Sequence, residues 1–388
     1  MGSMNGKKVH EEDDDEAVKP VFNSYFSPAR ERAYYGPPLE YHFVDTQVTV
    51  RPQSEGFSRT PSLSSEDEGH YLLLEQPYSR GFRLLHFTKI PGGLQRTGHL
   101  GAAVLIDFQG IFSRNPATCH LGGCTELRVE KAWLQSTRVQ SGLLSRCIQH
   151  VLNTSNIEES IKRGAQSGER LLSVAMTGQE DCRLTTPGNG GGTTSVMRVD
   201  LFFEMTGQLT SEQFTYTMAL VPCKVTYKSQ VMFRPVPNVS CDWRATLTQH
   251  LSQGWRLVDI YIDIPTVSQF FDPKSQDFSP FSMDALWFFE KPLSRLEDTV
   301  PRYEGKVIEH AVKVNSHATG TSAVACWEGV MLDMGKRGWE LAAVVETHSM
   351  ECVGFTEVLL KSLLFFQRPL VQGHNSPAMT ASRASLSD

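Results

Sequence analysis

The chain has 388 residues, of which 40% are hydrophobic and 10% aromatic, so it can bury several cores and is not disordered throughout. Its formal net charge of −6 argues against a DNA-binding protein, whose surface would be basic. The sequence contains no apolar run of about 18 residues, which a membrane-spanning helix needs, and no apolar signal segment near Met1.

Eight cysteines are scattered along the chain, as is typical of a reducing compartment in which thiols act as small buried hydrophobic groups. Cys119, His120 and Cys124 approach the spacing of zinc ligands, but no second pair follows to complete a tetrahedral set. We therefore predict no metal, no cofactor and a cytoplasmic location.

Both ends of the chain are polar. Residues 1–38 are predicted to be a disordered acidic segment because residues 11–16 form a block of like charges. Residues 371–388 are small and polar and are predicted to be a disordered tail. Two internal stretches, residues 53–68 and 185–195, are rich in Ser or Gly and are predicted to be loops.

The rest of the chain repeats a short pattern built on a glycine. The clearest copies are Gly254-Trp255-Arg256-Leu257 and Gly338-Trp339-Glu340-Leu341, and the others begin at Gly168 and Gly81. A leucine lies three residues after the glycine in every copy. Four diverged copies of one module are therefore predicted.

Helical spacing precedes the glycine. The apolar pairs Ile157 and Ile161, Trp243 and Leu247, and Trp327 and Met331 each lie four residues apart, on one face of a helix. Ser155 with Glu158 indicates a capping box at one helix start. The glycine suits the left-handed position that ends a helix. In the first copy, Pro77 interrupts the expected helix.

Strands flank each predicted helix. The predicted opening strands are Tyr41–Val50, Leu127–Leu134, Val225–Phe233 and Lys306–Val314. The last strands contain consecutive aromatic residues, at Phe202-Phe203, Phe288-Phe289 and Phe365-Phe366. Because neighbouring side chains of a strand point to opposite faces, these strands are expected to be covered on both faces.

The predicted fold class is therefore α+β. Four tandem βαββ modules are expected at residues 39–115, 125–208, 212–293 and 301–370. They form paired, mostly antiparallel sheets with helices packed on one face. The order in which the modules pair and the oligomeric state stay open.

The repeats resemble a small-domain family of unknown function that has a Gly-Trp-Glu-Leu motif and a terminal Phe-[Lys/Gln]-Arg-Pro motif, as at Gly338 and Phe366–Pro369. Over residues 39–370 the chain resembles the raftlins, which are lipid-raft-associated proteins of the inner plasma-membrane leaflet. Matching stretches include Leu39–Phe43, Trp243–Asp259 and Trp327–Pro369. The matching positions are core positions, so they carry more information about fold than about activity.

The resemblance implies acyl anchoring near the N terminus. Raftlins carry acyl chains on an N-terminal Gly-Cys pair, whereas this chain has Gly2 followed by Ser3. Myristoylation of Gly2 is the corresponding modification, and a single myristoyl chain needs a second membrane signal. Alternatively, Met1–Ser3 is a vector-derived addition ahead of a native Met4.

We find no catalytic motif and predict no catalytic residue. His86, His250 and His348 have no paired base or nucleophile in the sequence, and Trp255 and Trp339 are predicted to lie in the core. Ser62 and Ser385 follow arginines and are candidate phosphorylation sites.

Two functional hypotheses follow from these observations. The first is a non-enzymatic, raftlin-like scaffold at the cytoplasmic membrane face, linked to raft organisation, receptor signalling or trafficking, with membrane lipids or membrane-associated proteins as partners. The second is a soluble module array that binds a small ligand or protein partner in a cleft between modules.

Overall fold

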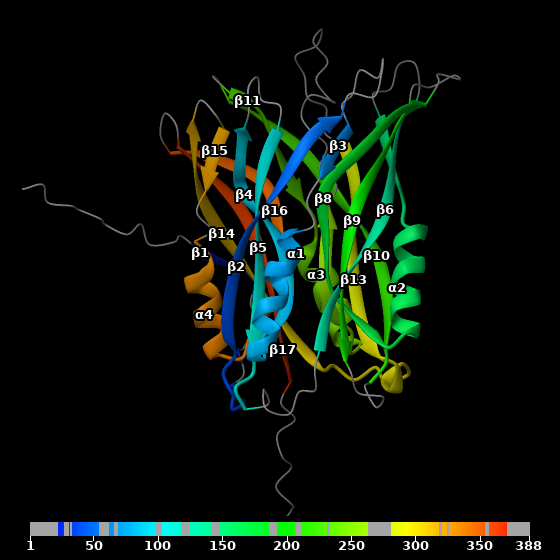
Figure 1. Ribbon diagram of the computed structural model, residues 1–388, viewed down its shortest axis with the longest axis vertical. Helices are drawn as coiled ribbons and strands as arrows, with labels where there is room; N and C mark the ends of the chain where they lie inside the picture. Colours follow the sequence, from blue (N-terminus) through cyan, green and yellow to red (C-terminus); the bar gives the residue numbers. More distant parts are fainter. Residues whose placement is uncertain are drawn as a thin grey trace, which may run out of the picture.

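The computed structural model describes residues 22–26, 31, 33–53, 62–65, 69–97, 103–117, 125–141, 147–185, 192–206, 212–230, 233–262, 281–317, 320–323, 326–353 and 357–370. This described part is mostly β-structure with four α-helices. All strand pairs are antiparallel, which confirms that part of the predicted fold. In Figure 1 the strands run along the long axis of the molecule, and the helices lie around them.

Four successive parts of the chain have the same order of elements, strand–strand–helix–strand–strand, and are named blades 1 to 4. Blade 1 contains β2 (Glu40–Gln53), β3 (Ser62–Ser65), α1 (Gly69–Glu75), β4 (Arg83–Thr97) and β5 (Ala103–Arg114). Blade 2 contains β6 (Thr125–Ser141), β7 (Cys147–Asn153), α2 (Ser155–Gln166), β8 (Glu169–Thr185) and β9 (Gly192–Thr206).

Blades 3 and 4 repeat this order. Blade 3 contains β10 (Phe214–Gln230), β11 (Phe233–Ser240), α3 (Trp243–Ser252), β12 (Arg256–Ile262) and β13 (Phe281–Pro292). Blade 4 contains β14 (Tyr303–His317), β15 (Gly320–Ala323), α4 (Glu328–Lys336), β16 (Glu340–Cys352) and β17 (Glu357–Pro369). Short 3₁₀-helices span Gln76–Arg80 and Leu293–Arg295.

Every blade has the same strand order in space: second, first, fourth, third. Blades 2 and 3 are separate four-stranded sheets. Blades 1 and 4 share a nine-stranded sheet, because β15 pairs with β4, where Gly320 lies opposite Gln95. The sheet also includes β1 (Phe22–Phe26), which pairs with β14.

The blades close into a propeller-like ring. The third strands β4, β8, β12 and β16 contact one another in succession, and β16 contacts β4 again. In Figure 1, α4 and α2 lie at opposite sides of the molecule, with α1 between them. The predicted paired arrangement of sheets is therefore corrected: each blade contacts two neighbours, because both faces of its sheet are apolar.

The hydrophobic cores lie between neighbouring blades. Phe202 packs in the core between blades 1 and 2, whereas the adjacent Phe203 packs in the core between blades 2 and 3. Phe288 and Phe289 divide between two cores in the same way. All four rings are 1% exposed or less, which confirms that these strands are covered on both faces.

A bulge follows the glycine turn in each third strand. Gly81, Gly168, Gly254 and Gly338 have φ of 78°, 79°, 82° and 73°. The strand register then shifts immediately after the leucine three residues later. A side chain accepts each leucine N–H: Tyr78 Oη from Leu84 (3.3 Å), Tyr216 Oη from Leu171 (2.8 Å), Gln367 Oε1 from Leu257 (2.9 Å) and Tyr41 Oη from Leu341 (2.8 Å).

The start of α2 differs from the predicted capping box. The residue that precedes α2 is Thr154, whose hydroxyl donates to Glu158 Oε1 at 2.6 Å. Ser155 is already helical, and its N–H is accepted by Asn153 Oδ1, so the prediction of Ser155 as the cap was wrong by one residue. In blade 1, Pro77 lies in a 3₁₀ turn that follows α1.

Several strands also differ from the βαββ prediction. Each blade has an additional strand before its helix, namely β3, β7, β11 or β15. The predicted strand Val225–Phe233 covers the end of β10 and the start of β11, so the predicted boundary lay inside a hairpin. Within residues 1–38, β1 pairs with β14, and Glu31 accepts a hydrogen bond from Trp339 Nε1 at 3.0 Å. Residues 371–388 lie outside the described part.

Candidate functional site

A buried polar cluster lies where the third strands meet. The residues five positions after the turn glycines are His86, Ser173, Asp259 and Ala343, and they are 3%, 0%, 1% and 0% exposed. Ser173 Oγ donates to Asp259 Oδ2 at 2.9 Å and lies 3.3 Å from His86 Nδ1. His86 Nδ1 is 3.2 Å from Asp259 Oδ2.

The cluster accepts backbone N–H groups from neighbouring blades. Ser173 Oγ accepts from Phe87 at 3.1 Å, Asp259 Oδ2 from Val174 at 2.7 Å, and His86 Nε2 from Val344 at 3.2 Å. The fourth position, Ala343, has no acceptor, and Asp259 Oδ1 accepts the N–H of Ile260 in its own blade at 2.7 Å. Buried N–H groups near each bulge are thereby satisfied.

The geometry of this cluster differs from that of a catalytic triad. In a triad, the hydroxyl and the carboxylate bind opposite nitrogens of the imidazole. Here Ser173 and Asp259 both face Nδ1, and Nε2 is occupied by a backbone N–H. Because all three side chains are also buried, we assign the cluster a structural role.

A charged cavity of about 250 Å³ lies at the junction of the blades, near the turn glycines. Arg83, Arg170 and Arg256 line it together with Glu204 and Glu340. Arg83 Nε is 3.2 Å from Glu204 Oε1, and Arg170 pairs with Glu290. The arginines are therefore neutralised by carboxylates of the same cluster.

Two carboxylates of this cluster have opposite pKa shifts. Burial raises the pKa of Glu204 above its ordinary value, although Arg83 and Arg170 act against it. Burial also disfavours the charge of Glu290, but Arg170 and Arg256 outweigh burial and lower its pKa. Arg256 lies 2.6 Å from Glu290 and also pairs with Glu340. The cluster connects blades 1 to 4 through ion pairs.

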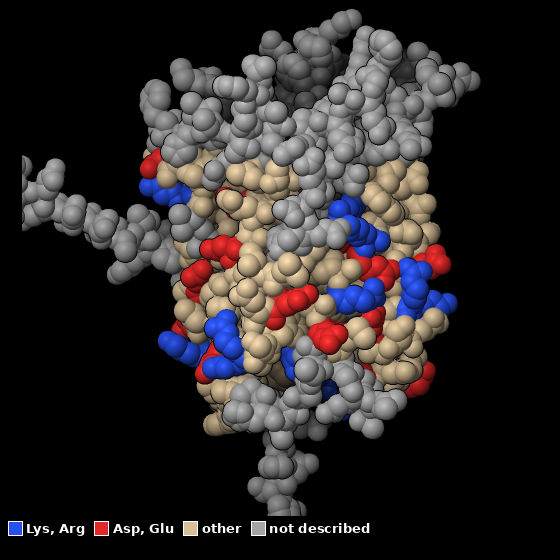
Figure 2. Space-filling view, in the orientation of Figure 1, with Lys and Arg blue, Asp and Glu red and all other residues tan. Residues whose placement is uncertain are grey.

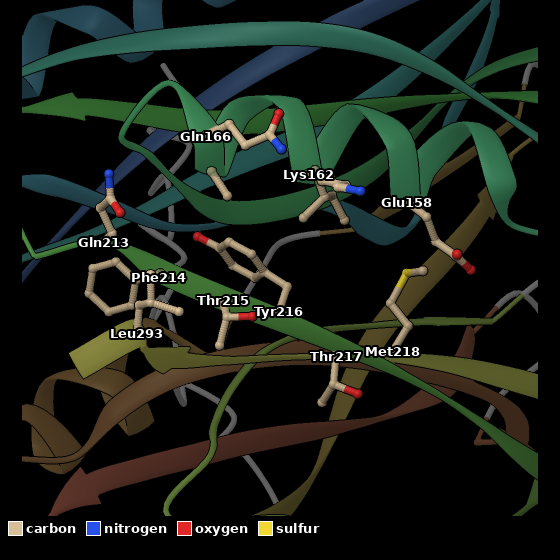
Figure 3. Close-up of a pocket in the computed structure, with 12 residues that line it drawn as sticks. Glu158, Lys162, Gln166, Gln213, Phe214, Thr215, Tyr216, Thr217, Met218 and Leu293 are labelled. Carbon is tan, nitrogen blue, oxygen red and sulfur yellow. The ribbon is translucent and has the colours of Figure 1, made fainter. Parts of the chain in front are cut away.

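A groove of about 550 Å³ lies between α2 of blade 2 and β10 of blade 3. Figure 3 shows Glu158, Lys162 and Gln166 on the helix side and Phe214, Tyr216 and Met218 on the strand side. The remaining lining residues are Ile161, Ala165, Gln213, Thr215, Thr217 and Leu293. An apolar floor with polar groups at its sides is typical of ligand and peptide sites.

The neighbouring interfaces are closed at the corresponding place. In the interface of α3 and β14, a Cβ added to Gly305 would lie 2.7 Å from Leu251 Cδ1. In the interface of α4 and β2, a Cβ added to Gly335 would lie 2.9 Å from Tyr41 Cδ2, and the Gly335 carbonyl accepts the N–H of Leu39 at 2.9 Å. Ala165 occupies the position of Leu251, three residues before the turn glycine, so α2 presents less side-chain volume to β10 than α3 presents to β14. In α4 this position is Gly335, and Leu39 and Tyr41 fill the space beside it.

The repeat anchors predicted from sequence surround the blade junctions. Gly81, Gly168, Gly254 and Gly338 end the helices. Trp339 is fully buried beneath Arg368, whose guanidinium lies 4.5 Å from the ring centroid, and Trp255 is partly buried with Lys291 above it. His250 stacks on Phe289, and His86 belongs to the axial cluster.

The other candidates are not brought together. Ser62 lies in β3, where it pairs with Gln53 of β2, although a loop was expected there. Gly2, Ser385 and the Cys119, His120 and Cys124 group lie outside the described residues. Among the described residues, no group of His, Cys, Asp and Glu is arranged to hold a metal.

The groove residues were missed in the sequence analysis. Ile161 was expected only as a core residue of a helix, and Phe214–Met218 were not assigned to a strand. A usable signal was present, because Phe214–Cys223 is a ten-residue stretch without a charge in which aromatic and β-branched residues recur.

Comparisons with protein-family models, curated proteins and solved structures find no match to this chain. Within the described residues, no helix is both long and apolar enough to cross a membrane.

Proposed function

We propose that this chain is a non-enzymatic binding scaffold that holds a partner in the groove between α2 and β10. The observation that carries the proposal is the groove itself, about 550 Å³ in volume and located at a boundary between two blades. Clefts between structural units are common places for ligands, because side chains from two units converge there. The non-enzymatic part of the proposal is supported by the geometry of the axial cluster, in which Ser173 and Asp259 both face Nδ1 of His86.

The blades are proposed to be diverged copies of an α+β module. Each has one helix and the same strand order, and each turn glycine is followed by a bulge at the same position. A ring of such copies provides four similar interfaces, three of which can serve stability while one acquires a ligand. This arrangement supports a scaffold more directly than it supports an enzyme.

The surface is consistent with a protein or peptide partner. Figure 2 shows acidic and basic side chains interspersed over one face of the molecule. A nucleic-acid partner would favour clustered basic side chains, and the net charge of −6 acts against it.

The groove can be tested with a photo-crosslinking residue at Thr217 in the full chain, expressed in cells. We expect an adduct with a partner, and we expect Ala165→Leu to reduce its yield about tenfold by filling the groove, equivalent to about 1.4 kcal/mol. The matched control is Ala245→Leu on the exposed face of α3. Absence of an adduct, or equal yields in both variants, would count against this function.

Membrane attachment is a separate proposal that rests on the resemblance to raftlins and on Gly2. Acylation of Gly2 would add a weak, reversible anchor to the scaffold. Intact-mass analysis and fractionation of wild type against Gly2→Ala test it. An unmodified, wholly soluble wild-type protein would remove the membrane part and leave the groove unaffected.

A further inference from the structure

The strand β10 has an open edge beside the groove. It pairs with β13 along Phe214–Val225 on one side. On the other side, β11 pairs only with Lys224–Gln230. Among the described strands, Phe214–Cys223 therefore has a neighbour on one side only, and the backbone groups on its other side can accept a further strand.

The same edge carries charges in the other blades. Leu220 lies opposite Leu286, three residues before Phe289. The equivalent positions are Asp45 opposite Gln109, Lys131 opposite Asp200, and Glu309 opposite Leu363. Charged side chains on an edge strand disfavour pairing with an apolar strand of another chain. The edge of β14 pairs with β1 of the same chain, and there the polar Asn23 lies opposite Glu309. Blade 3 alone has an aliphatic residue at this position, and Leu220 is 51% exposed.

The difference extends along the whole strand. Next to the helix of the preceding blade, β2 carries Glu40 and Asp45, β6 carries Glu126, Arg128, Glu130 and Lys131, and β14 carries Glu304, Lys306 and Glu309. No charged residue occurs between Phe214 and Cys223 of β10. Pro222 lies near the end of this stretch, as is common in edge strands.

One face of β10 presents apolar side chains. Tyr216, Met218 and Leu220 alternate along the strand and share this face. Tyr216 and Met218 are only partly buried against the core between blades 2 and 3. The apolar stripe therefore continues from the groove floor onto the exposed edge.

The molecule contains its own example of strand addition at an equivalent edge. The strand β1 pairs with β14 in antiparallel orientation, with Phe22 opposite His310 and Phe26 opposite Val307. In blade 3 the equivalent residues are Val221 and Met218, judged from their partners on β13 and β17. An added strand at β10 would also extend the ladder that β11 already forms with Lys224–Gln230.

We propose that the groove binds an extended peptide segment of a partner protein, which adds as an antiparallel strand to Phe214–Cys223 of β10. Alternate apolar side chains of the peptide contact Tyr216, Met218 and Leu220, while its backbone pairs with the edge. The inference rests on the proposed function, since it assigns the binding mode and the partner chemistry of the same groove.

The test uses a phage-displayed library of random nine-residue peptides, selected on the full chain. The variant Leu220→Lys introduces into β10 the charge that Lys131 carries at the same register position of β6. The substituted side chain is exposed. Its matched control is Leu332→Lys on α4, where the leucine is 45% exposed. We expect enriched peptides with alternating apolar residues. The affinity of Leu220→Lys for these peptides should be at least tenfold lower than that of wild type, and the affinity of Leu332→Lys should equal that of wild type.

Hydrogen exchange locates the bound peptide. With a selected peptide, amide protection should increase in Phe214–Cys223 of the full chain. No enriched peptide, equal binding to Leu220→Lys, or protection elsewhere would overturn the proposal. Concentration-dependent dimers that Leu220→Lys dissociates would assign the edge to a second copy and overturn it too.

The proposed function can survive this failure. If Ala165→Leu abolishes the crosslinked adduct at Thr217 whereas Leu220→Lys leaves the adduct unchanged, the groove binds a partner without strand addition. If neither variant affects a partner, both the groove and its binding mode are wrong.

Discussion

At the ring axis, the strands β4, β8, β12 and β16 carry bulges, and side chains such as Asp259 and His86 accept backbone N–H groups beside them. At the outer edge, β2, β6 and β14 carry charged side chains, whereas β10 carries none between Phe214 and Cys223. A buried N–H without an acceptor costs about 1–3 kcal/mol, while an N–H at the outer edge can bind water. A substitution at the axis therefore needs a second, compensating substitution to keep the fold stable. Residues at the outer edge can change without such compensation, so this edge can acquire a binding role.

The largest expected effect is at the axis. Asp259→Ala removes the acceptor of Val174 and Ile260 N–H and leaves both buried. We expect the free energy of unfolding to fall by about 3–5 kcal/mol. Lys131→Ala, at the outer edge, should change it by about 0.5 kcal/mol or less. Denaturant titrations measure both, and similar losses at the two positions would break the comparison.

The next effect concerns an outer strand that β1 covers. Burial lowers the pKa of His310 to about 4, and its Nε2 lies 3.2 Å from Cys326 Sγ. Between about pH 6.5 and pH 4 the unfolded state binds a proton that the folded state does not bind. The contribution of His310 to the free energy of unfolding is therefore fully present above about pH 6.5. It falls by about 3 kcal/mol as the pH falls to 4.

His310→Gln tests this pH dependence. The variant should lose stability less steeply between pH 6.5 and pH 4, whatever its stability at neutral pH. Thermal unfolding at a series of pH values gives the slope. A slope equal to that of wild type would mean that His310 is accessible to protons in the folded ring.

A smaller effect sharpens the account of the axis. Ala343 is the position without an acceptor, and Asp259 accepts the N–H of Ile260 in its place. In an Ala343→Ser background, Asp259→Ala should cost about 1 kcal/mol less, because the new hydroxyl can accept that N–H. A double-mutant cycle measures the coupling, and strictly additive effects would contradict a shared role of the two positions.

The smallest effect is expected for the stability of Leu220→Lys. Since Leu220 is 51% exposed, the free energy of unfolding should change by about 0.5 kcal/mol or less. Unfolding by urea would show this. A large loss would mean that Leu220 supports the fold, and the binding experiment would then need a more conservative variant, such as Leu220→Thr.

Local features of this fold could be predicted from the sequence, and features that depend on ring closure could not. The turn at Gly254 and the two-sided burial of Phe288 and Phe289 follow from periodicity and strand geometry. The contact between His86, Ser173 and Asp259 could not be predicted, because each residue belongs to a different blade. Strands of four residues, such as β3 and β15, are too short to produce a pattern.

The groove could be predicted from the sequence only in part. The uncharged stretch from Phe214 to Cys223 is visible in the sequence, and its comparison with Glu126–Lys131 needs only the correct alignment of strands. That the stretch is an edge beside α2 depends on the position of blade 2. The predicted boundary at Val225 placed the strand too late and concealed it.

The pairing of β15 with β4 has a consequence for how the ring is made. Among the described blades, this is the only boundary crossed by strand pairing, and it joins Gly320 to Gln95, about 225 residues earlier in the chain. Contacts so distant in sequence form slowly, whereas the sheets of blades 2 and 3 need only local segments. During synthesis the nascent chain would therefore remain an open arc. The edge of β4 would stay unpaired until β15 leaves the ribosome, late in translation.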